Sequence, residues 1–255
     1  MCKIIGIDVS KHNGIINWQT VKNSSMEIDF AIIRAGYGSS PKQKDEKFEA
    51  NYLGAKQNGI PVGAYWYCYA KNASEALNEA KAFIEVAKGK QFDLPVFYDI
   101  EEKESFPKAA EIAEAFCSYL ESKGYYVGVY CSSSHVKTHM PGITAKYAGW
   151  IADWTKKPGN IPWIVWQYSS KGRVEGISGN VDLDAFVSED TFHNVQTTIY
   201  QNGMNGYQKQ YTSTVPIDPS KDTNIETTIC NILDTLEKMN KELKQACDTL
   251  KKLIS

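Results

Sequence analysis

The residues of this sequence best suited to chemistry are two carboxylates at the end of an apolar segment. Residues 94–101 form the run Leu-Pro-Val-Phe-Tyr-Asp-Ile-Glu, which places Asp99 and Glu101 two positions apart. On a β-strand such residues share one face, with backbones about 6.5–7 Å apart. Two carboxyl groups at this spacing could act on a single bond, as they do in the cleavage of glycosidic bonds. The alternative is a strand that ends in acidic residues by chance.

Other short apolar segments of the chain also carry acidic residues at their ends. Asp8 closes the first segment, Asp153 follows a later one, and Asp182 with Asp184 stands in the last. In a barrel of parallel strands the carboxyl ends of the strands converge on one mouth, and catalytic residues gather there. We therefore expect acidic side chains from several strands to surround one site.

The segments that must position these acids alternate between strand and helix patterns. Eight apolar runs rich in Val, Ile, Tyr and Trp are predicted as strands: residues 3–8, 29–35, 61–67, 94–100, 125–131, 148–152, 163–168 and 177–183. Helical patterns over residues 45–58, 74–88 and 108–123 separate the early strands, with Ser74 as the expected N-cap of the second helix. After residue 131 the intervals shorten. This order predicts an α/β fold, an irregular TIM-like barrel from which the last helices are missing.

The overall composition excludes several classes of protein. With 255 residues, of which 42% are hydrophobic and 23% charged, the chain can bury a large core and carry an appendage. A net charge of −2 and the lack of long Lys/Arg runs argue against nucleic acids or membrane surfaces as partners. No apolar run approaches the roughly 20 residues that span a bilayer. The first residues show no signal peptide, so we expect synthesis in the cytoplasm.

The cysteine and histidine residues show no spacing typical of a metal site or a compact disulfide framework. Cysteines stand at positions 2, 68, 117, 131, 230 and 247, and histidines at positions 12, 135, 139 and 193. His135 and His139 have helical spacing, but Pro141 follows closely. We therefore expect buried free thiols and no metal or other cofactor.

The composition changes near residue 190, where we place the end of a barrel formed by residues 1–190. Residues 191–220 are polar and contain Asn-Gly and Pro breakers, so they are predicted to form a linker. If this is correct, the barrel folds without the tail, for example as a fragment of residues 1–195.

The last part of the chain, residues 221–255, has a different pattern. Apolar residues from Ile225 to Leu253 alternate in steps of four and three, which is typical of a coiled coil over four heptads. Three of the four a positions are Leu and two d positions are Ile, an arrangement that favours tetramers over dimers. The alternative, an amphipathic helix lying on the barrel, usually has a broader apolar face. We expect self-association through residues 225–253.

Five motifs, in this order along the chain, resemble glycoside hydrolase family 25. The motifs lie at residues 6–10 (GIDVS), 30–38 (FAIIRAGYG), 59–67 (GIPVGAYWY), 99–101 (DIE) and 181–184 (VDLD). Members of that family are the Chalaropsis-type lysozymes, or N-acetylmuramidases, which are common among bacteriophage endolysins and bacterial autolysins. The resemblance covers about residues 3–190, and the tail lies outside it.

The resemblance implies a (β/α)5(β)3 barrel that cleaves the β-1,4 bond between N-acetylmuramic acid and N-acetylglucosamine in peptidoglycan. Carried over by position, Glu101 is the proton donor, and Asp8, Asp99 and Asp182 are the other carboxylates of the groove. The leaving group of a glycoside must be protonated as it departs, and the longer side chain of Glu101 also favours it as the acid.

Sugar contacts and the route of the reaction are less constrained by the sequence. Tyr65 and Trp154 are the expected substrate contacts, because the motifs beside them match the family, although either could be packing. Arg34 ends an apolar strand, so we expect it to pair with an acid. In hydrolases with the same Asp-x-Glu order the substrate's own acetamido group attacks, and Asp99 would hold it. We favour this retaining route over a covalent enzyme intermediate.

Two other functions remain open. A chitinase-like hydrolase would share the Asp-x-Glu arrangement, but it gives no reason for Asp8 at the end of the first strand. A glycan-binding barrel without activity could use the coiled coil for avidity. If the chain is an endolysin without a signal peptide, it reaches the cell wall through a holin-like pore or after lysis.

Overall fold

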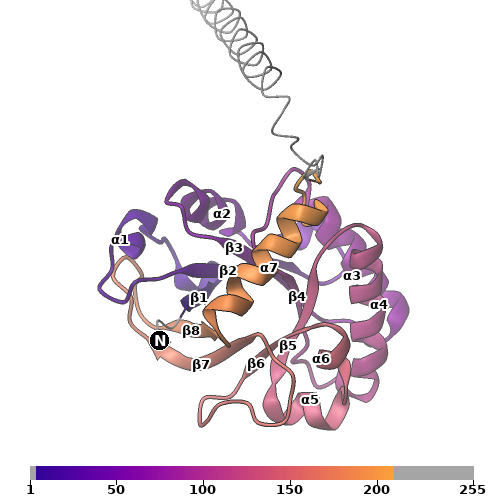
Figure 1. Ribbon diagram of the computed structural model, residues 1–255. Helices are drawn as coiled ribbons and strands as arrows, with labels where there is room; N and C mark the ends of the chain where they lie inside the picture. The colour runs from indigo at the N-terminus through magenta and orange to yellow at the C-terminus, as the bar shows by residue number, and fades with distance from the viewer. Residues whose placement is uncertain (1–3, 210–255) are drawn as a thin grey trace, which may run out of the picture. The chain divides into compact units, whose positions relative to one another are not determined.

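The computed structural model describes residues 4–209, and its strands close into one barrel. The strands are β1 (Ile5–Val9), β2 (Phe30–Tyr37), β3 (Val62–Tyr67), β4 (Val96–Asp99), β5 (Val127–Ser132), β6 (Ala148–Ala152), β7 (Val165–Gly172) and β8 (Val181–Phe186). Each of the eight predicted strands corresponds to one of them. Neighbours in the chain are neighbours in the sheet, and β8 closes the barrel against β1 (Figure 1).

The last strand differs from the others in direction. All pairs from β1 to β7 are parallel, whereas β8 is antiparallel to both β7 and β1. A short connection can join antiparallel neighbours but not parallel ones, which need a long crossover. The last strand was predicted over residues 177–183 in a barrel of parallel strands, and both its bounds and its direction differ from that prediction. Asp182 lies at the start of β8, and the reversal brings it beside Asp8 of β1.

Helices cover the outside of the barrel between the strands. They are α1 (Trp18–Lys22), α2 (Phe48–Gln57), α3 (Ala73–Ala87), α4 (Ala109–Ser122), α5 (Ser133–His139), α6 (Ile143–Lys146) and α7 (Glu189–Asn202), with 3-10 turns at Lys11–Asn13, Pro41–Gln43 and Phe106–Lys108. The three long helices expected between the early strands are α2, α3 and α4. Ser74 is not the N-cap of α3, because Asn72 precedes the helix and accepts a 3.0 Å hydrogen bond from the Glu75 N–H.

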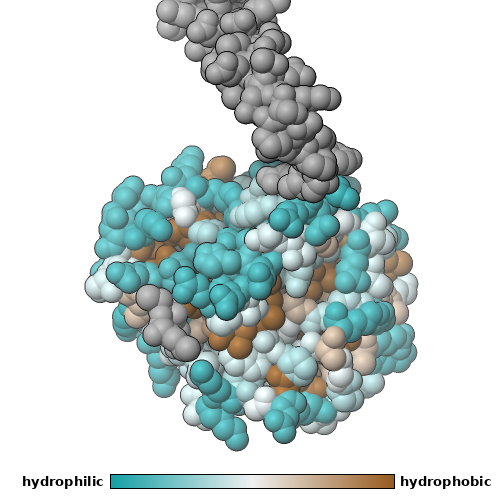
Figure 2. All heavy atoms as spheres, in the orientation of Figure 1, coloured by the Kyte–Doolittle hydropathy of each residue, from teal (hydrophilic) through white to brown (hydrophobic). Residues whose placement is uncertain are grey.

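Two apolar layers hold the barrel together. One lies between the strands and the surrounding helices, and the other fills the barrel interior and includes Phe30, Phe97 and Trp150. Glycines on the strands make room for these large rings: a Cβ atom on Gly6 would lie 2.4 Å from the Phe30 ring. On the face that carries α7, hydrophilic side chains cover most of the surface and hydrophobic ones form separate groups (Figure 2).

The predicted linker at residues 191–220 is wrong for its first part, because α7 occupies residues up to 202. The segment is polar overall, but Phe192, Val195 and Ile199 form one buried stripe. This stripe joins the apolar cluster of the barrel interior, so α7 closes one end of the barrel (Figure 1). The first Asn-Gly breaker ends the helix, with Gly203 as the C-cap at φ 64°, and the second, Asn205-Gly206, follows it.

The predicted coiled coil at residues 225–253 lies outside the described part of the chain. Within residues 4–209, none of the helices is long and apolar enough to span a membrane.

Candidate active site

A cavity of about 420 Å³ opens at the ends of the strands. Its lining consists of Asp8, Val9, Ser10, His12, Asn13, Arg34, Tyr65, Tyr67, Asp99, Glu101, Tyr130, Trp150, Gln167, Asn180 and Asp182. Polar and aromatic side chains therefore make up most of the wall, and carboxylates are the commonest charged groups in it.

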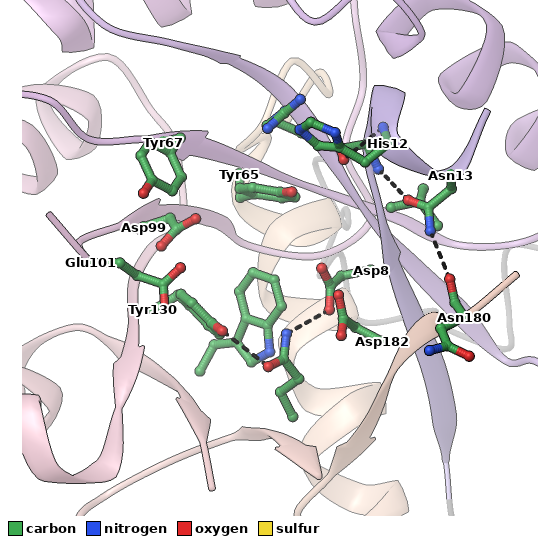
Figure 3. A pocket seen from close by; sticks show the side chains of 15 residues that line it. Asp8, His12, Asn13, Tyr65, Tyr67, Asp99, Glu101, Tyr130, Asn180 and Asp182 are labelled. Carbon is green, nitrogen blue, oxygen red and sulfur yellow. Dashed lines mark hydrogen bonds between the residues drawn. The ribbon is translucent and has the colours of Figure 1, made fainter. Parts of the chain in front are cut away.

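The four carboxylates predicted from the sequence lie in this one cavity. Asp99 ends β4 and Glu101 follows it, whereas Asp8 and Asp182 face each other in register on β1 and β8. Figure 3 shows Asp99 and Glu101 together on one side of the cavity and Asp8 and Asp182 on the other. A bond placed between the two pairs would have acidic groups on both sides.

Burial and mutual repulsion make these carboxyl groups hard to ionise. Burial raises the pKa of Asp8 and of Asp99 well above the usual range, and the nearby charges of Asp182 and Glu101 add to the effect. Burial also raises the pKa of Glu101, again with a contribution from Asp182, and raises that of Asp182 to about 6. Crowded carboxylates cannot all be charged, so at least one is held neutral and can donate a proton.

Asp184, the second acid of the motif on β8, lies deeper in the barrel and does not line the cavity. It is fully buried and accepts a 2.7 Å hydrogen bond from the indole Nε1 of Trp150. Burial, followed by the charge of Asp8, raises the pKa of Asp184 well above the usual range. Asp184 therefore affects the ionisation of Asp8 but does not contact a ligand in the cavity.

Asp153 does not join the other acids at the mouth, contrary to the expectation for acids at strand ends. Its carboxylate accepts hydrogen bonds from the hydroxyls of Ser133, at 2.7 Å, and Thr155, at 2.8 Å. Burial alone would raise the pKa of Asp153, but these bonds lower it to about 2. Asp153 therefore holds the loop after β6 in place as a permanent anion.

Arg34 has the acidic partner that its position predicts. Its Nε donates a 2.6 Å hydrogen bond to Asp45 Oδ2, and Asp45 is almost fully buried. The Nη2 atom of Arg34 is buried without a hydrogen-bond partner. The charge of Arg34 also lowers the pKa of Asp99, against the larger effect of burial.

The two predicted sugar contacts occupy different places. Tyr65 lines the cavity and packs edge-on against Trp150, with ring centroids 5.8 Å apart. Trp154 is not among the lining residues, and its ring is 59% exposed. Its indole Nε1 donates a hydrogen bond to Gln167, which does line the cavity. Trp154 therefore lies next to the cavity wall at an exposed position.

Gln167 and Tyr130 are parts of the site that sequence reasoning did not assign. The Nε2 of Gln167 donates a 2.8 Å hydrogen bond to Asp8 Oδ2, and the Tyr130 hydroxyl donates a 3.0 Å bond to Gln167 Oε1. The dashed lines from Asp8 and Tyr130 in Figure 3 mark these bonds. One indication of this role is present in the sequence: Gln167 is an amide residue within an apolar strand. A single amide of this kind does not identify its partner across the barrel.

The His pair and the described cysteines that the sequence singled out do not line the cavity. His135 and His139 lie on α5 and pack on the Phe106 ring at centroid distances of 4.2 and 4.6 Å. Residues 4–209 contain no group of three or more side chains suited to hold a metal ion. The described cysteines, Cys68, Cys117 and Cys131, are buried free thiols, as expected.

Comparison with known proteins agrees with this geometry. The family model described as "Glycosyl hydrolases family 25" matches residues 7–177. Lysozyme M1 of Streptomyces globisporus is 34% identical over 201 residues, which cover 71% of this chain and 67% of that protein.

Two solved structures show the same fold. The autolysin LytC of Streptococcus pneumoniae, solved in complex with a synthetic peptidoglycan ligand, is 30% identical with a TM-score of 0.64. The match covers 72% of this chain but only 46% of LytC, so the chain spans less than half of that protein. The catalytic domain of endolysin ply40, from bacteriophage P40 of Listeria monocytogenes, is 25% identical with a TM-score of 0.63, over 76% of this chain and 98% of that domain. The strand order, the acidic cavity and the match over residues 7–177 together show that the chain belongs to glycosyl hydrolase family 25.

Proposed function

We propose that the chain is a lysozyme that hydrolyses the β-1,4 bond between N-acetylmuramic acid and N-acetylglucosamine in peptidoglycan. The observation that carries the proposal is the cavity with acidic groups on both sides, which suits the cleavage of a glycosidic bond. The likeness to Lysozyme M1 and to LytC, which was solved with a peptidoglycan ligand, supports this substrate class.

In this proposal Glu101 is the general acid. Its side chain extends into the cavity from the loop after β4, and burial together with Asp182 favours the protonated form that the leaving oxygen needs. Asp99, two residues earlier and more deeply buried, faces the same space. We assign to Asp99 the orientation of the substrate's acetamido group, whose oxygen attacks the sugar carbon in the retaining route.

Asp8 and Asp182 form the opposite wall and supply negative charge. Glycosidic cleavage passes through a sugar that carries positive charge, so a carboxylate facing it stabilises the transition state. Tyr65 and Asp99 both line the cavity, and the exposed side chain of Trp154 offers an apolar face at its edge. We assign sugar contacts to both rings.

The deciding experiment is mass spectrometry of purified cell walls digested with the full chain. Products that end in N-acetylmuramic acid at the reducing end support the proposal. Products that end in N-acetylglucosamine would place the cut at the other glycosidic bond and refute it. Cleavage of chitin oligomers in preference to cell walls would indicate the chitinase-like alternative, and wall binding without any products would indicate a binding module.

We further propose that residues 225–253 assemble the chain, with a tetramer as the expected state. The support is the heptad pattern of the sequence, with Leu at most a positions. Light scattering on the full chain and on the Leu236→Asp/Leu243→Asp double variant tests this. A monomeric wild type would refute the assembly, and a tetramer that the double variant converts to monomers would support it.

We also propose that the chain acts on the bacterial cell wall from inside the cell, and its likeness to the endolysin of bacteriophage P40 supports the cell wall as the target. In that role the chain needs a membrane lesion to reach its substrate. Expression in a bacterium with and without a co-expressed holin tests this proposal. Lysis only with the holin would support it, and rapid lysis without the holin would contradict it.

A further inference from the structure

Gln167 of β7 links the wall of the cavity to Asp8. The side chain is 3% exposed and takes part in three hydrogen bonds. Its Nε2 donates to Asp8 Oδ2 at 2.8 Å, and its Oε1 accepts from the Tyr130 hydroxyl at 3.0 Å and from Trp154 Nε1 at 3.1 Å. A buried amide with both ends engaged in this way has one fixed orientation.

Trp154 and an ionised Asp8 favour the same orientation of the amide. An indole N–H can only donate, so it requires the oxygen of Gln167 on its side. If the amide were turned over, the N–H groups of Trp154 and Gln167 would face each other, and Asp8 would lose the hydrogen bond from Gln167. The Tyr130 hydroxyl cannot enforce this choice alone, because a hydroxyl either donates or accepts.

The amide N–H of Gln167 acts on the charge of Asp8. Asp8 is 6% exposed, and burial followed by the charge of Asp182 disfavours its ionised form. A hydrogen bond donated to the carboxylate favours the ionised form, and the Gln167 bond has this direction. It also fixes the rotation of the carboxylate, because it engages one of its two oxygens.

We propose that Gln167 is a positioning residue that favours the ionised form of Asp8 and holds its carboxylate toward the cavity, and that Trp154, together with Asp8, sets the orientation of the Gln167 amide. This inference rests on the proposed function, in which Asp8 supplies negative charge opposite Glu101. In this proposal Trp154 has two roles: its exposed ring contacts the substrate at the edge of the cavity, and its N–H orients the Gln167 amide.

The Gln167→Glu variant separates positioning from mere packing, because it keeps the shape of the side chain. While the introduced carboxyl is protonated, it can donate to Asp8 as the amide does. Once ionised, it loses the donor and adds a repelling charge. The ratio of its kcat to that of the wild type should therefore be highest at pH 4–5 and fall at least about tenfold by pH 8. Gln167→Met has no donor at any pH, so its kcat should be about 100-fold low throughout, with KM changed less.

Trp154→Phe tests the second half of the proposal. It keeps an aromatic face for the sugar but removes the N–H, so kcat should fall about tenfold while KM stays within about threefold. The matched control is Trp163→Phe, since Trp163 Nε1 donates to the Pro158 carbonyl and Trp163 does not line the cavity. Its kcat should stay within about twofold of wild type.

The outcomes against the proposal are distinct. Parallel pH profiles of wild type and Gln167→Glu would overturn the role of Gln167, and an unchanged kcat in Trp154→Phe would overturn the role of Trp154. In both cases the wild type still cleaves peptidoglycan, so the proposed function stands. A wild type that leaves the β-1,4 bond intact would overturn the proposed function and this inference with it. Unfolding midpoints measured for each variant show whether a loss of kcat reflects a loss of folded protein.

Discussion

Cutting the chain at residue 195, within α7, should destabilise the barrel rather than release it. The cut removes Ile199, which is fully buried in the barrel interior, and this loss costs about 1.5–3 kcal/mol. It also removes Asn205, whose side chain accepts from the Tyr126 N–H at 2.8 Å and donates to the Leu94 carbonyl at 2.9 Å.

Each buried backbone group that loses its partner costs about 1–3 kcal/mol. Together with the loss of Ile199, the free energy of unfolding should fall by about 3.5–9 kcal/mol, a large share of the 5–15 kcal/mol typical of a domain. A fragment of residues 1–195 should therefore be largely unfolded or aggregated at 37 °C. The sequence alone suggested the opposite, because it placed the linker at residue 191.

The assay is thermal unfolding followed by circular dichroism, with a fragment of residues 1–211 as the matched control, because it retains all of the described residues 4–209. The longer fragment should melt cooperatively and hydrolyse short peptidoglycan fragments. The Asn205→Ala variant of the full chain should lie between the two, with a loss of about 2–6 kcal/mol. A 1–195 fragment that melts within about 2 °C of the longer one would refute the assignment of α7 to the barrel.

The remaining predictions concern the carboxylates. Glu101→Gln keeps the shape of the side chain but lacks the transferable proton, so turnover should fall about 10²–10⁴-fold with the fold intact, and lytic activity within tenfold of wild type would contradict the assignment. Asp99→Asn should lower kcat strongly while the circular dichroism spectrum stays unchanged; an unfolded variant would make Asp99 structural instead. Because the pKa of Glu101 is raised and its acid form is required, kcat of the wild type should decline as pH rises through that pKa, and a rate independent of pH from 4 to 8 would argue against this acid. The pKa of Asp182 is raised from 3.8 to about 6 in the folded protein, so the fold favours the protonated carboxyl. The free energy of folding gained from this group is therefore largest below about pH 4 and is lost as pH rises through about 6. Asp182→Asn should therefore melt at a higher temperature than wild type at pH 7 and at a similar one at pH 4; a lower melting temperature at pH 7 would show that the charge stabilises the fold.

Some features of the molecule follow from local sequence alone. The strands are short runs of Val, Ile and aromatic residues between breakers, and the burial of both faces in a barrel requires such runs. Asp99 and Glu101 could be paired from their spacing, because residues two apart on a strand share one face. The acid partner of Arg34 was predictable in kind, since a charge at the end of a buried strand needs compensation, but its identity as Asp45 was not.

Tertiary structure decided the rest, because it depends on contacts between distant parts of the chain. Asp182 reaches the mouth of the barrel only because β8 runs antiparallel. Asp153 also follows a strand, but its carboxylate binds the Ser133 hydroxyl and does not line the cavity. Polar residues surround Phe192, Val195 and Ile199 in the sequence of α7, so the sequence did not indicate a buried face. Only the packing of these three residues into the barrel interior shows that the helix belongs to the barrel. The bond between Gln167 and Asp8 joins residues 159 positions apart, and neither local propensity nor spacing carries information over that distance. The sequence by itself therefore determined which acids are available, whereas the closed barrel decided which of them meet and how each is held.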